Sequence, residues 1–309
     1  MKTISIMTAC YNEEENIRSV YEEVKKVFER LDGYACEHLF IDNASQDRTV
    51  SILKEITAED TSVKVIVNTR NFGPIRSPYH AILQSTGDAV ISLAADLQEP
   101  PSMIEDFVHK WEEGFKVVVA VKSQSEENPV MFGIRRLYYN LIERSAETKQ
   151  IKGFTGFGLY DREVVELLRT LHEPYPYFRG LITEMGFKTA SIPFVQPKRK
   201  KGKAKINLYT LYDVAMLGFV NHSKVPLRMA TFIGFSVSIL SLLVAIGYFV
   251  YKLVFWDRFQ VGMAPMVIGL FFFAAVQLFF IGIIGEYIGA IYTQVKNRPL
   301  VIEKERINF

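Results

Sequence analysis

The chain has 309 residues, enough for one large domain or two modest ones, and its 36 Lys and Arg nearly balance its 34 Asp and Glu. A formal net charge of +2 excludes a protein that binds nucleic acid through bulk charge. The two cysteines, Cys10 and Cys36, exclude a disulfide scaffold and favour a reducing compartment.

The first 125 residues alternate strand and helix patterns. Five apolar runs lack the alternation of half-exposed strands, which is typical of a parallel sheet covered on both faces. The helical pattern at 14–31 places its apolar residues on one face, and a second helix at 45–56 begins with Ser45 or Asp47 as its cap. We therefore expect a doubly wound, mostly parallel α/β sheet with strands at 3–9, 37–43, 63–68, 88–94 and 115–121.

Polar loops follow three of these strands. They read TACYNEEENI at 8–17, DNASQDRT at 42–49 and LAADLQEPP at 93–101. Because the carboxyl ends of parallel strands meet at one edge of a sheet, the loops are expected to share a ligand. The third loop has Asp96 and an amide but Ala94 where a second acid would suit a metal. This loop is a metal site, a metal site that has lost one ligand, or a loop in which Asp96 only caps the next helix.

Beyond residue 125 the pattern loosens. Residues 131–147 can form an amphipathic helix, which lies either in a membrane interface or against the core. The basic run PKRKKGKAK at 197–205 is either a solvated segment or one that attracts anionic lipid headgroups. The second interpretation is favoured because the next residues form an amphipathic stretch and then a long apolar run.

Two charge-free runs, 230–250 and 265–285, contain 21 residues each, against about 20 needed to cross the hydrocarbon core. Two cations precede the first run and four come after the second, whereas the connecting loop carries only Lys252 and Arg258. This bias predicts a multi-pass protein of the cell (inner) membrane with both termini cytoplasmic. The N-terminus leads from a strand straight into a charged helix, so we expect no signal peptide and a cytosolic α/β domain.

The three loops, in this order, resemble the family-2 glycosyltransferases of the GT-A fold, whose patterns are xxYNExxNI, D(D/N)xSxDxT and ADLQxPP. The sequence HSKVPLR at 222–228 and the two apolar runs narrow the resemblance to the polyprenyl-phosphate glycosyltransferases. That group includes bactoprenol glucosyltransferases and dolichol-phosphate mannose synthases. The resemblance covers nearly the whole chain. Any one motif is weak, whereas the ordered set with a membrane anchor is specific.

The resemblance implies a site for a nucleotide-sugar donor at the matching positions. Tyr11 and Glu13 would border the base and ribose, and Asp42 would accept a hydrogen bond from the base. Arg70, in the loop after the third strand, would help to hold the sugar nucleotide. Thr8, at the start of the first motif, belongs to the same predicted set.

The resemblance also implies a divalent metal, Mg²⁺ or Mn²⁺, bound by Asp96 and Gln98 at the donor diphosphate. These ions accept hard oxygen ligands, and a Mg²⁺ site commonly uses only one or two carboxylates plus phosphate oxygens. Many relatives have an acid where this chain has Ala94, so we expect weak metal binding without donor. Glu99 would add negative charge behind the ligands.

A second departure concerns the acceptor. Many relatives carry an acid and an arginine in the stretch where this chain has Gly156 and Gly158. A phosphate monoester has a second pKa near about 6 and is largely a dianion at neutral pH, so no general base is required. The enzyme must instead supply positioning and charge neutralisation. Each candidate cation fits a solvated surface as well as a lipid phosphate, and the candidates are Arg135, Arg179, Arg199, Lys201 and Lys203.

The predicted activity is inverting transfer of a hexose, glucose first, from a nucleotide diphosphate sugar to a polyprenyl phosphate such as undecaprenyl phosphate, at the cytoplasmic membrane face, for cell-surface glycan modification. The predicted catalytic residues are Asp96, Arg135, Arg179, Arg199 and Lys203. The predicted organisation is a GT-A domain at 1–205, an amphipathic helix at 206–228 and a two-helix anchor with a short tail at 229–309. The predicted partners are the donor, the lipid and the membrane, with a homo-oligomer such as a tetramer and without nucleic acid.

Three alternatives stay open. A processive polysaccharide synthase is disfavoured because the sequence has no Gln-x-x-Arg-Trp stretch and too few apolar runs for a channel. A membrane scaffold that binds nucleotide sugar without turnover is favoured by Ala94, Gly156 and Gly158 but opposed by the retained loop residues. A flippase for lipid-linked sugars is disfavoured by the large α/β domain.

Overall fold

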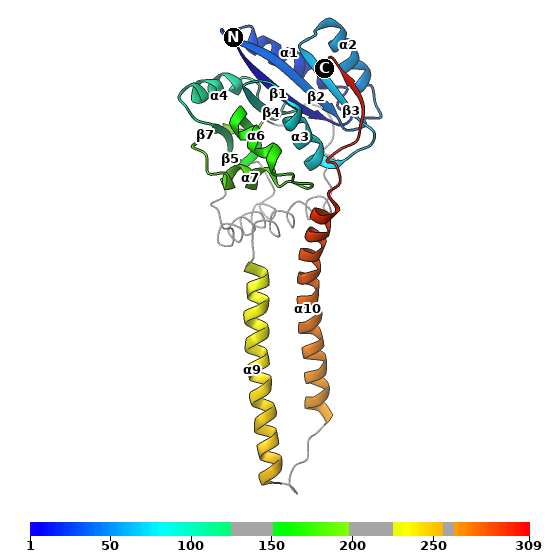
Figure 1. Cartoon of the computed structure of the whole chain (residues 1–309), viewed down its shortest axis with the longest axis vertical. Coiled ribbons are helices and arrows are strands. Elements are labelled where there is room, and N and C mark those ends of the chain that lie inside the picture. The colour runs from blue at the N-terminus through cyan, green and yellow to red at the C-terminus, as the bar shows by residue number, and fades with distance from the viewer. Residues whose placement is uncertain (125–150, 198–224, 256–262) are drawn as a thin grey trace.

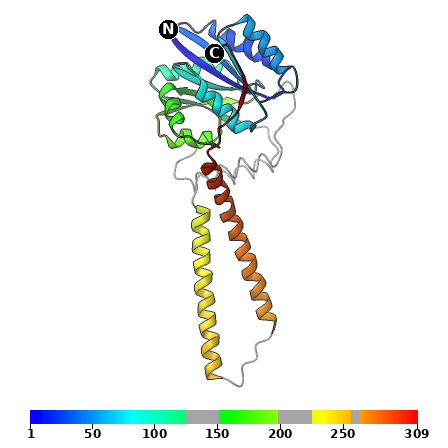
Figure 2. The ribbon, with the colours of Figure 1, turned by 45° about the vertical axis from the view of Figure 1, so that its right-hand side comes forward.

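The computed structural model describes residues 1–124, 151–197, 225–255 and 263–309. An α/β head stands at one end of two long helices (Figure 1). The helices are α9 (Val225–Val254) and α10 (Met263–Lys296), and after α10 the chain returns along the side of the head. The molecule is therefore a globular head on a helical hairpin, and the same separation is seen in the rotated view of Figure 2.

The head is built on one mixed sheet of eight strands in the order β7-β5-β6-β4-β1-β2-β3-β8. The contiguous part β4-β1-β2-β3 is parallel, as the unbroken apolar runs predict. The doubly wound, mostly parallel α/β sheet expected from the sequence is thus confirmed. The strands are β1 (Lys2–Cys10), β2 (Tyr34–Asp42), β3 (Val63–Asn68), β4 (Ala89–Ala94), β5 (Val117–Gln124), β6 (Phe154–Asp161), β7 (Thr189–Val195) and β8 (Glu303–Ile307).

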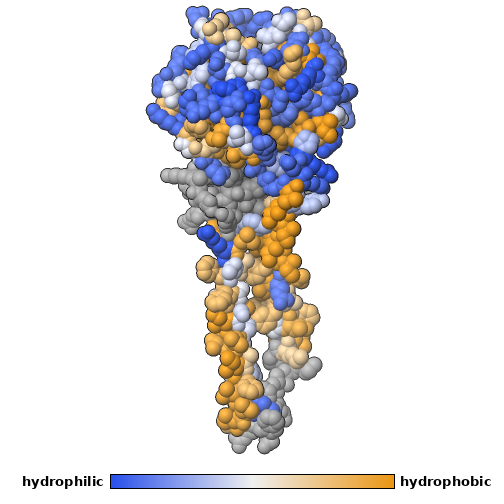
Figure 3. All heavy atoms as spheres, viewed as in Figure 1, coloured by the Kyte–Doolittle hydropathy of each residue, from blue (hydrophilic) through white to orange (hydrophobic). Residues whose placement is uncertain are grey.

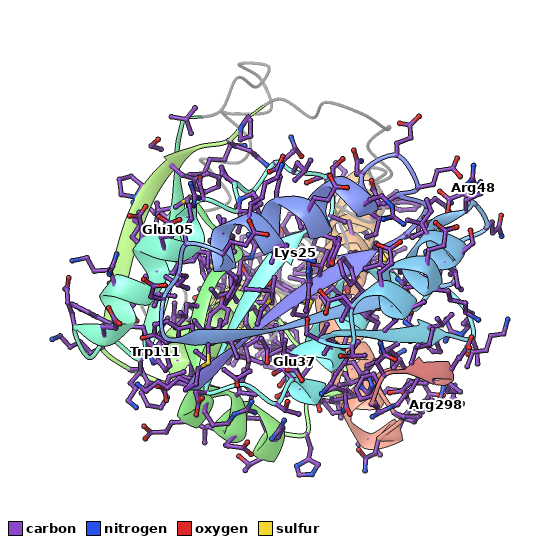
Figure 4. All side chains as sticks on the ribbon, turned by 90° about the horizontal axis from the view of Figure 1, so that it is seen from above. Lys25, Glu37, Arg48, Glu105, Trp111 and Arg298 are labelled. Atoms are coloured by element: carbon purple, nitrogen blue, oxygen red, sulfur yellow. The ribbon has the colours of Figure 1, made fainter. Side chains whose placement is uncertain are left out.

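Helices cover both faces of the sheet, so the core is divided into two layers. Apolar residues of α1, α2 and α4 pack on one face, and those of α3, α6 and α7 pack on the other. Seen from above in Figure 4, Lys25 of α1 and Glu105 of α4 lie on the same side of the sheet. The bounds are α1 (Ile17–Phe28), α2 (Thr49–Glu59), α3 (Gly73–Gln84), α4 (Met103–Glu112), α6 (Arg162–Thr170) and α7 (Phe178–Glu184).

The sheet departs from a simple succession of strands at β6. The fifth expected strand is present as β5, but β6 lies between it and β4 and runs antiparallel to both. Gly158 of β6 makes this insertion possible, because a Cβ there would lie 2.3 Å from the Val118 carbonyl oxygen. The pairing therefore requires glycine at this position for close approach of two backbones.

The two long helices are mainly apolar, and most of their large apolar side chains are exposed in the structure. Phe232 of α9 is 72% exposed and Leu270 of α10 is 68% exposed. Figure 3 shows the contrast between the apolar helices and the mainly hydrophilic head. With 30 residues, α9 is about 45 Å long, and both helices are long and apolar enough to cross a membrane.

A buried carboxylate ties the amino-terminal ends of the parallel strands together. Glu37 of β2 is 5% exposed, and its oxygens accept hydrogen bonds from Lys64 Nζ (2.6 Å), from Thr86 N (2.8 Å) and from the Ser5 hydroxyl. Burial alone would raise the pKa of Glu37, but the hydrogen bonds from Lys64, Ser5 and Thr86 outweigh it and lower the pKa to about 2.

We expect this carboxylate to make the head sensitive to acid. A group with a lowered pKa stabilises the folded state above its unfolded pKa, near 4.5, and loses that contribution as the pH falls toward about 2. The loss amounts to about 3 kcal/mol at most. Glu37→Gln should flatten the decline of the unfolding midpoint between about pH 5 and pH 3. Glu55→Gln, on an exposed carboxylate, is the control and should keep the wild-type slope.

Candidate active site

The carboxyl ends of β1, β2 and β4 lie side by side at one edge of the sheet. Cys10 at the end of β1 is in register with Asp42 at the end of β2, and Ala9 is in register with Ala94 at the end of β4. The three polar loops singled out in the sequence therefore begin at neighbouring positions. The predicted convergence of these loops is confirmed.

The loops after β1 and β2 are bonded to each other. The Asn12 amide donates to Ser45 Oγ (2.8 Å), and Asn12 Oδ1 accepts from the Gln46 amide (2.7 Å). The Glu13 amide donates to Thr49 Oγ1 (2.9 Å), at the start of α2. Asn12 has φ 52°, a left-handed conformation that asparagine tolerates better than most residues. The first two motifs thus form one rigid unit.

Asp42 is fully buried at the centre of this unit. Its Oδ2 accepts from the Ser45 amide (2.9 Å), and burial raises the pKa of its carboxyl. It borders a cavity of about 250 Å³ between the ends of β2 and β3 and the C-terminal strand β8. The cavity is lined by Asp42, Ala44, Ser45, Val50, Lys54, Val67, Asn68, Thr69, Lys304 and Glu305.

The loop after β4 is a tight turn held by its own acids. Leu97 has φ 57°, and Asp96 Oδ1 accepts from the Gln98 amide (3.1 Å). Glu99 Oε2 accepts from the Ala94 amide (2.7 Å), and its Oε1 accepts from Thr155 Oγ1 (3.3 Å). A carboxylate thus lies against the backbone of Ala94, the position where the sequence lacks an acid.

The pKa of Glu99 is displaced by its surroundings. Burial raises the pKa of Glu99 to about 7, against the lowering effect of the Ala94 amide and with a smaller contribution from the charge of Asp96. Through Thr155 it also joins the loop to the start of β6. Sequence reasoning gave Glu99 only a distant electrostatic role, because the contact with Thr155 spans 56 positions in the chain.

The side-chain amide of Gln98 contacts Pro197, the last described residue before the cations of the basic run. Gln98 Nε2 donates to the Pro197 carbonyl (3.4 Å), and the basic run continues from the next residue, Lys198. The predicted cations Arg199, Lys201 and Lys203 lie outside the described residues, as does Arg135. The contact with Pro197 nevertheless shows that the chain enters the basic run directly beside the third loop.

The remaining predicted cations lie on either side of the loops. Arg179 of α7 donates to the Phe154 carbonyl (3.3 Å) at the start of β6, one residue from Thr155. Arg70 donates to the Asn71 carbonyl (3.0 Å) and lies 4.0 Å from the centroid of the Phe72 ring. Arg179 is thus linked through β6 to the third loop, and Arg70 follows β3.

Among the predicted donor-site residues, Thr8 lies inside strand β1 and its role stays a prediction. Thr8 is fully buried inside β1, and its hydroxyl lies 3.1 Å from His38 Nε2 of β2. Burial lowers the pKa of His38 to about 3, so the imidazole is neutral. The side chain of Thr8 therefore packs within the sheet two residues before the strand ends, whereas Tyr11 and Glu13 belong to the loop itself.

The third loop fits a divalent cation of the Mg²⁺ type. Its oxygen donors are the Asp96 carboxylate and the Gln98 amide, with Glu99 beside them, and such a set suits an ion completed by phosphate oxygens. Within the described residues no cluster of three or more His, Cys, Asp or Glu could hold a metal alone. Weak metal binding in the absence of a phosphate ligand stays a prediction.

Comparisons with known proteins place the chain among glycosyltransferases. Residues 5–168 match the model of glycosyl transferase family 2, and residues 226–291 match that of the GtrB C-terminal hairpin. A bactoprenol glucosyl transferase of Shigella phage SfX is 33% identical over 98% of this chain and 99% of its own length. A prophage-derived bactoprenol glucosyl transferase of Shigella flexneri is 33% identical over 98% and 97%.

Among solved structures, glucosyl-3-phosphoglycerate synthase from Mycobacterium tuberculosis in complex with Mn²⁺, UDP and phosphoglyceric acid matches with a TM-score of 0.46 and 17% identity, over 71% of this chain and 76% of that chain. The family model spans more than half of the chain, and the relatives match nearly all of it. The chain therefore belongs to the family 2 glycosyltransferases and carries the C-terminal hairpin of the GtrB type.

Proposed function

We propose that the protein transfers a hexose, with glucose as the first candidate, from a nucleotide diphosphate sugar to a polyprenyl phosphate such as undecaprenyl phosphate. The proposal is supported by the full-length similarity to bactoprenol glucosyl transferases and by the three converging loops. The product is a lipid-linked sugar for modification of cell-surface glycans. We place the reaction at the cytoplasmic face of the cell membrane, with both termini cytoplasmic.

The observation that carries the proposal is the position of the loops relative to the apolar hairpin. Only residues 297–302 separate the end of α10 from β8, and Glu303, the first residue of β8, pairs with Asn68, the last residue of β3. The carboxyl edge of the parallel strands thus lies on the side of the head from which α10 extends (Figure 1). In addition, Gln294 of α10 donates to Glu173 of the head (2.7 Å). An acceptor held in a membrane around the hairpin would meet the loops directly.

Two contacts of described residues support a phosphate acceptor beside the third loop. The basic run begins beside Gln98, and Arg179 is linked to the loop through β6. Guanidinium and ammonium groups bind phosphate through charge-assisted hydrogen bonds. We propose that Arg179, together with Arg135, Arg199, Lys201 and Lys203, holds the lipid phosphate at headgroup height.

The proposed mechanism is a single in-line displacement with inversion. The lipid phosphate is already a dianion, and one of its oxygens attacks the anomeric carbon of the donor. The bond between the anomeric carbon and the donor diphosphate breaks at the same time, and the nucleoside diphosphate leaves. Asp96 and Gln98 would hold a divalent cation, which would supply charge stabilisation for the leaving diphosphate. The lipid-site cations fix the acceptor in line. Tyr11, Glu13, Asp42 and Arg70 are proposed to hold the rest of the donor, and the active form is proposed to be a homo-oligomer such as a tetramer.

The direct test is a transfer assay on the purified full-length protein in detergent. Undecaprenyl phosphate, Mg²⁺ or Mn²⁺ and a panel of radiolabelled nucleotide sugars are supplied, and label is followed into the organic phase. We expect one donor to label the lipid and EDTA to abolish the labelling. Binding of a donor without any labelling would contradict the proposed transfer and favour a nucleotide-sugar-binding scaffold.

A further inference from the structure

The cavity beside Asp42 has a wall that comes from the far end of the chain. One side is formed by the end of β2 and the following loop, another by the end of β3 and by Lys54 of α2, and the last by Lys304 and Glu305 of β8. More than 230 positions separate Lys304 from the next lining residue, Thr69. The cavity is therefore incomplete without the segment that comes after the apolar hairpin.

A bulge explains why two consecutive residues of β8 face the cavity. Glu305 is in register with Val67 and Glu303 with the adjacent Asn68, so Lys304 is an extra residue without a partner on β3. Neighbouring side chains of a regular strand point to opposite faces, and a bulge breaks this alternation and redirects a side chain. The irregularity thus brings Lys304 to the same cavity as Glu305.

The wall is fixed firmly to the head. The Thr69 amide donates to the Ile302 carbonyl (2.9 Å), and His80 Nε2 lies 2.6 Å from Glu303 Oε1. At the other end of β8, Asn308 Nδ2 donates to the carbonyls of Thr57 (2.9 Å) and Val63 (3.0 Å). The strand is anchored before and after the bulge, so the position of Lys304 is defined by the fold.

Of the charged residues that β8 brings to the cavity, Glu305 is paired within the protein, and Lys304 remains available to a ligand. Lys54 Nζ pairs with both oxygens of Glu305, at 2.9 Å and 2.8 Å, which neutralises that carboxylate. Within the part of the chain that the structure describes, Lys304 has no ion pair and no side-chain hydrogen bond. Lys304 is an exposed residue that lines the cavity, and its ammonium group can donate to a bound oxygen.

The position of the cavity matches one half of a nucleotide sugar. At about 250 Å³ it lies just below the usual range for a whole drug-sized ligand and suits a nucleoside. Strand β2 is separated from β4 by β1, so the end of β2, which forms the near side of the cavity, lies about 10 Å along the sheet edge from the end of β4, where the third loop begins. An extended nucleoside diphosphate covers this distance with its base end in the cavity and its phosphates at Asp96.

We propose that the C-terminal strand completes the donor site, and that Lys304 binds the nucleoside half of the donor by donating to one of its oxygen acceptors. The inference rests on the proposed function, because it takes the ligand to be a nucleotide sugar. It assigns to the segment after the apolar hairpin a part in choosing the donor. Lys304 is a binding residue in this assignment and has no part in the chemical step.

The test is equilibrium binding of free nucleoside diphosphates to the full-length protein in detergent with Mg²⁺. UDP, GDP, TDP and ADP are titrated, and the tightest is used for the variants. Lys304→Met is expected to raise its Kd about 5- to 20-fold, as loss of one charge-assisted hydrogen bond predicts. Lys304→Arg should stay within about threefold of wild type. In the transfer assay Lys304→Met should raise KM for the donor and leave kcat within about twofold.

Lys26→Met is the matched control, because it removes one exposed cation from α1 without touching the cavity. It should bind within about twofold of wild type, which separates a direct contact from general attraction of an anion. Equal binding by Lys304→Met and wild type would overturn the role of the tail. Nucleoside diphosphate binding needs no acceptor, so a wild-type protein that binds but does not label lipid contradicts only the proposed function. Failure to bind any of the four would overturn the inference itself.

Discussion

Asp96→Ala is expected to lower the rate of sugar transfer roughly a thousandfold, the order of effect that loss of charge stabilisation at a metal site produces. Asp96 is the one carboxylate of the predicted ligand pair. Position 94 is alanine, so this position has no acid that could replace Asp96. The substitution should also remove the response of the rate to Mg²⁺ or Mn²⁺. Transfer is measured by initial rates of lipid labelling with donor and acceptor both saturating.

Asp106→Ala provides the matched control for this substitution. Asp106 is an exposed acid in the first turn of α4, ten residues further along the chain. Its loss removes the same charge from the head and should leave the rate within about twofold. If Asp96→Ala kept more than about one-tenth of the wild-type rate, the third loop would not hold the leaving diphosphate.

Gly158→Ala is expected to have the largest effect on stability, with a loss of about 3 kcal/mol or more in the free energy of unfolding. The added Cβ would lie 2.3 Å from the Val118 carbonyl oxygen and 3.0 Å from Val119 Cα. Both atoms belong to the backbone of β5, so no side chain can rotate away. Either β6 separates from β5 or the head fails to fold, and thermal unfolding of the purified protein measures the loss.

Gly156→Ala is the comparison, since it lies two residues away in the same strand. There the nearest atom to a new Cβ is Phe178 Cδ1 at 4.0 Å, and the cost comes only from φ +107°. We expect a loss of about 1–2 kcal/mol. An unfolding midpoint for Gly158→Ala that equals or exceeds that of Gly156→Ala would mean that β5 and β6 do not pair as described.

These glycines bear on the scaffold alternative. From the sequence, Gly156 and Gly158 count as lost functional residues, together with Ala94. The structure gives Gly158 a packing reason of its own, because an arginine cannot fit between β4 and β5 at that point. Glu99 also holds the backbone of Ala94 in place. Two of the three departures are therefore compatible with a working site.

The parallel part of the sheet was predictable because its signals are local. Each of β1 to β4 is rich in apolar residues and mostly buried, and the loop motifs begin at the strand ends. The prediction missed β6, β7 and β8. The run FTGFGLYD of β6 contains two glycines, which disguise a strand, and β8 is the charged run EKERI at an exposed edge. Such pairings are set by distant partners rather than by local pattern.

The candidate site shows the same division. Motif residues such as Asp42, Asp96 and Gln98 fall where the sequence places them, at the strand ends. The side chain of Thr8 is buried against His38, and a motif does not show which face of a strand a residue takes. Lys304 carries no signal in the sequence, since its place depends on a bulge in a strand that pairs with β3 more than 230 residues earlier.

The return of the chain to β3 has a consequence for biosynthesis. During translation the head emerges first, and domains generally begin to fold from the N-terminal side. Until β8 has been made, the outer edge of β3 is an open strand of the kind that promotes aggregation. Because β8 comes after both α9 and α10, the sheet closes only after the apolar hairpin has left the ribosome. A nascent chain that stalls before the hairpin is complete therefore keeps the outer edge of β3 unpaired. Chaperones and proteases can bind such an edge.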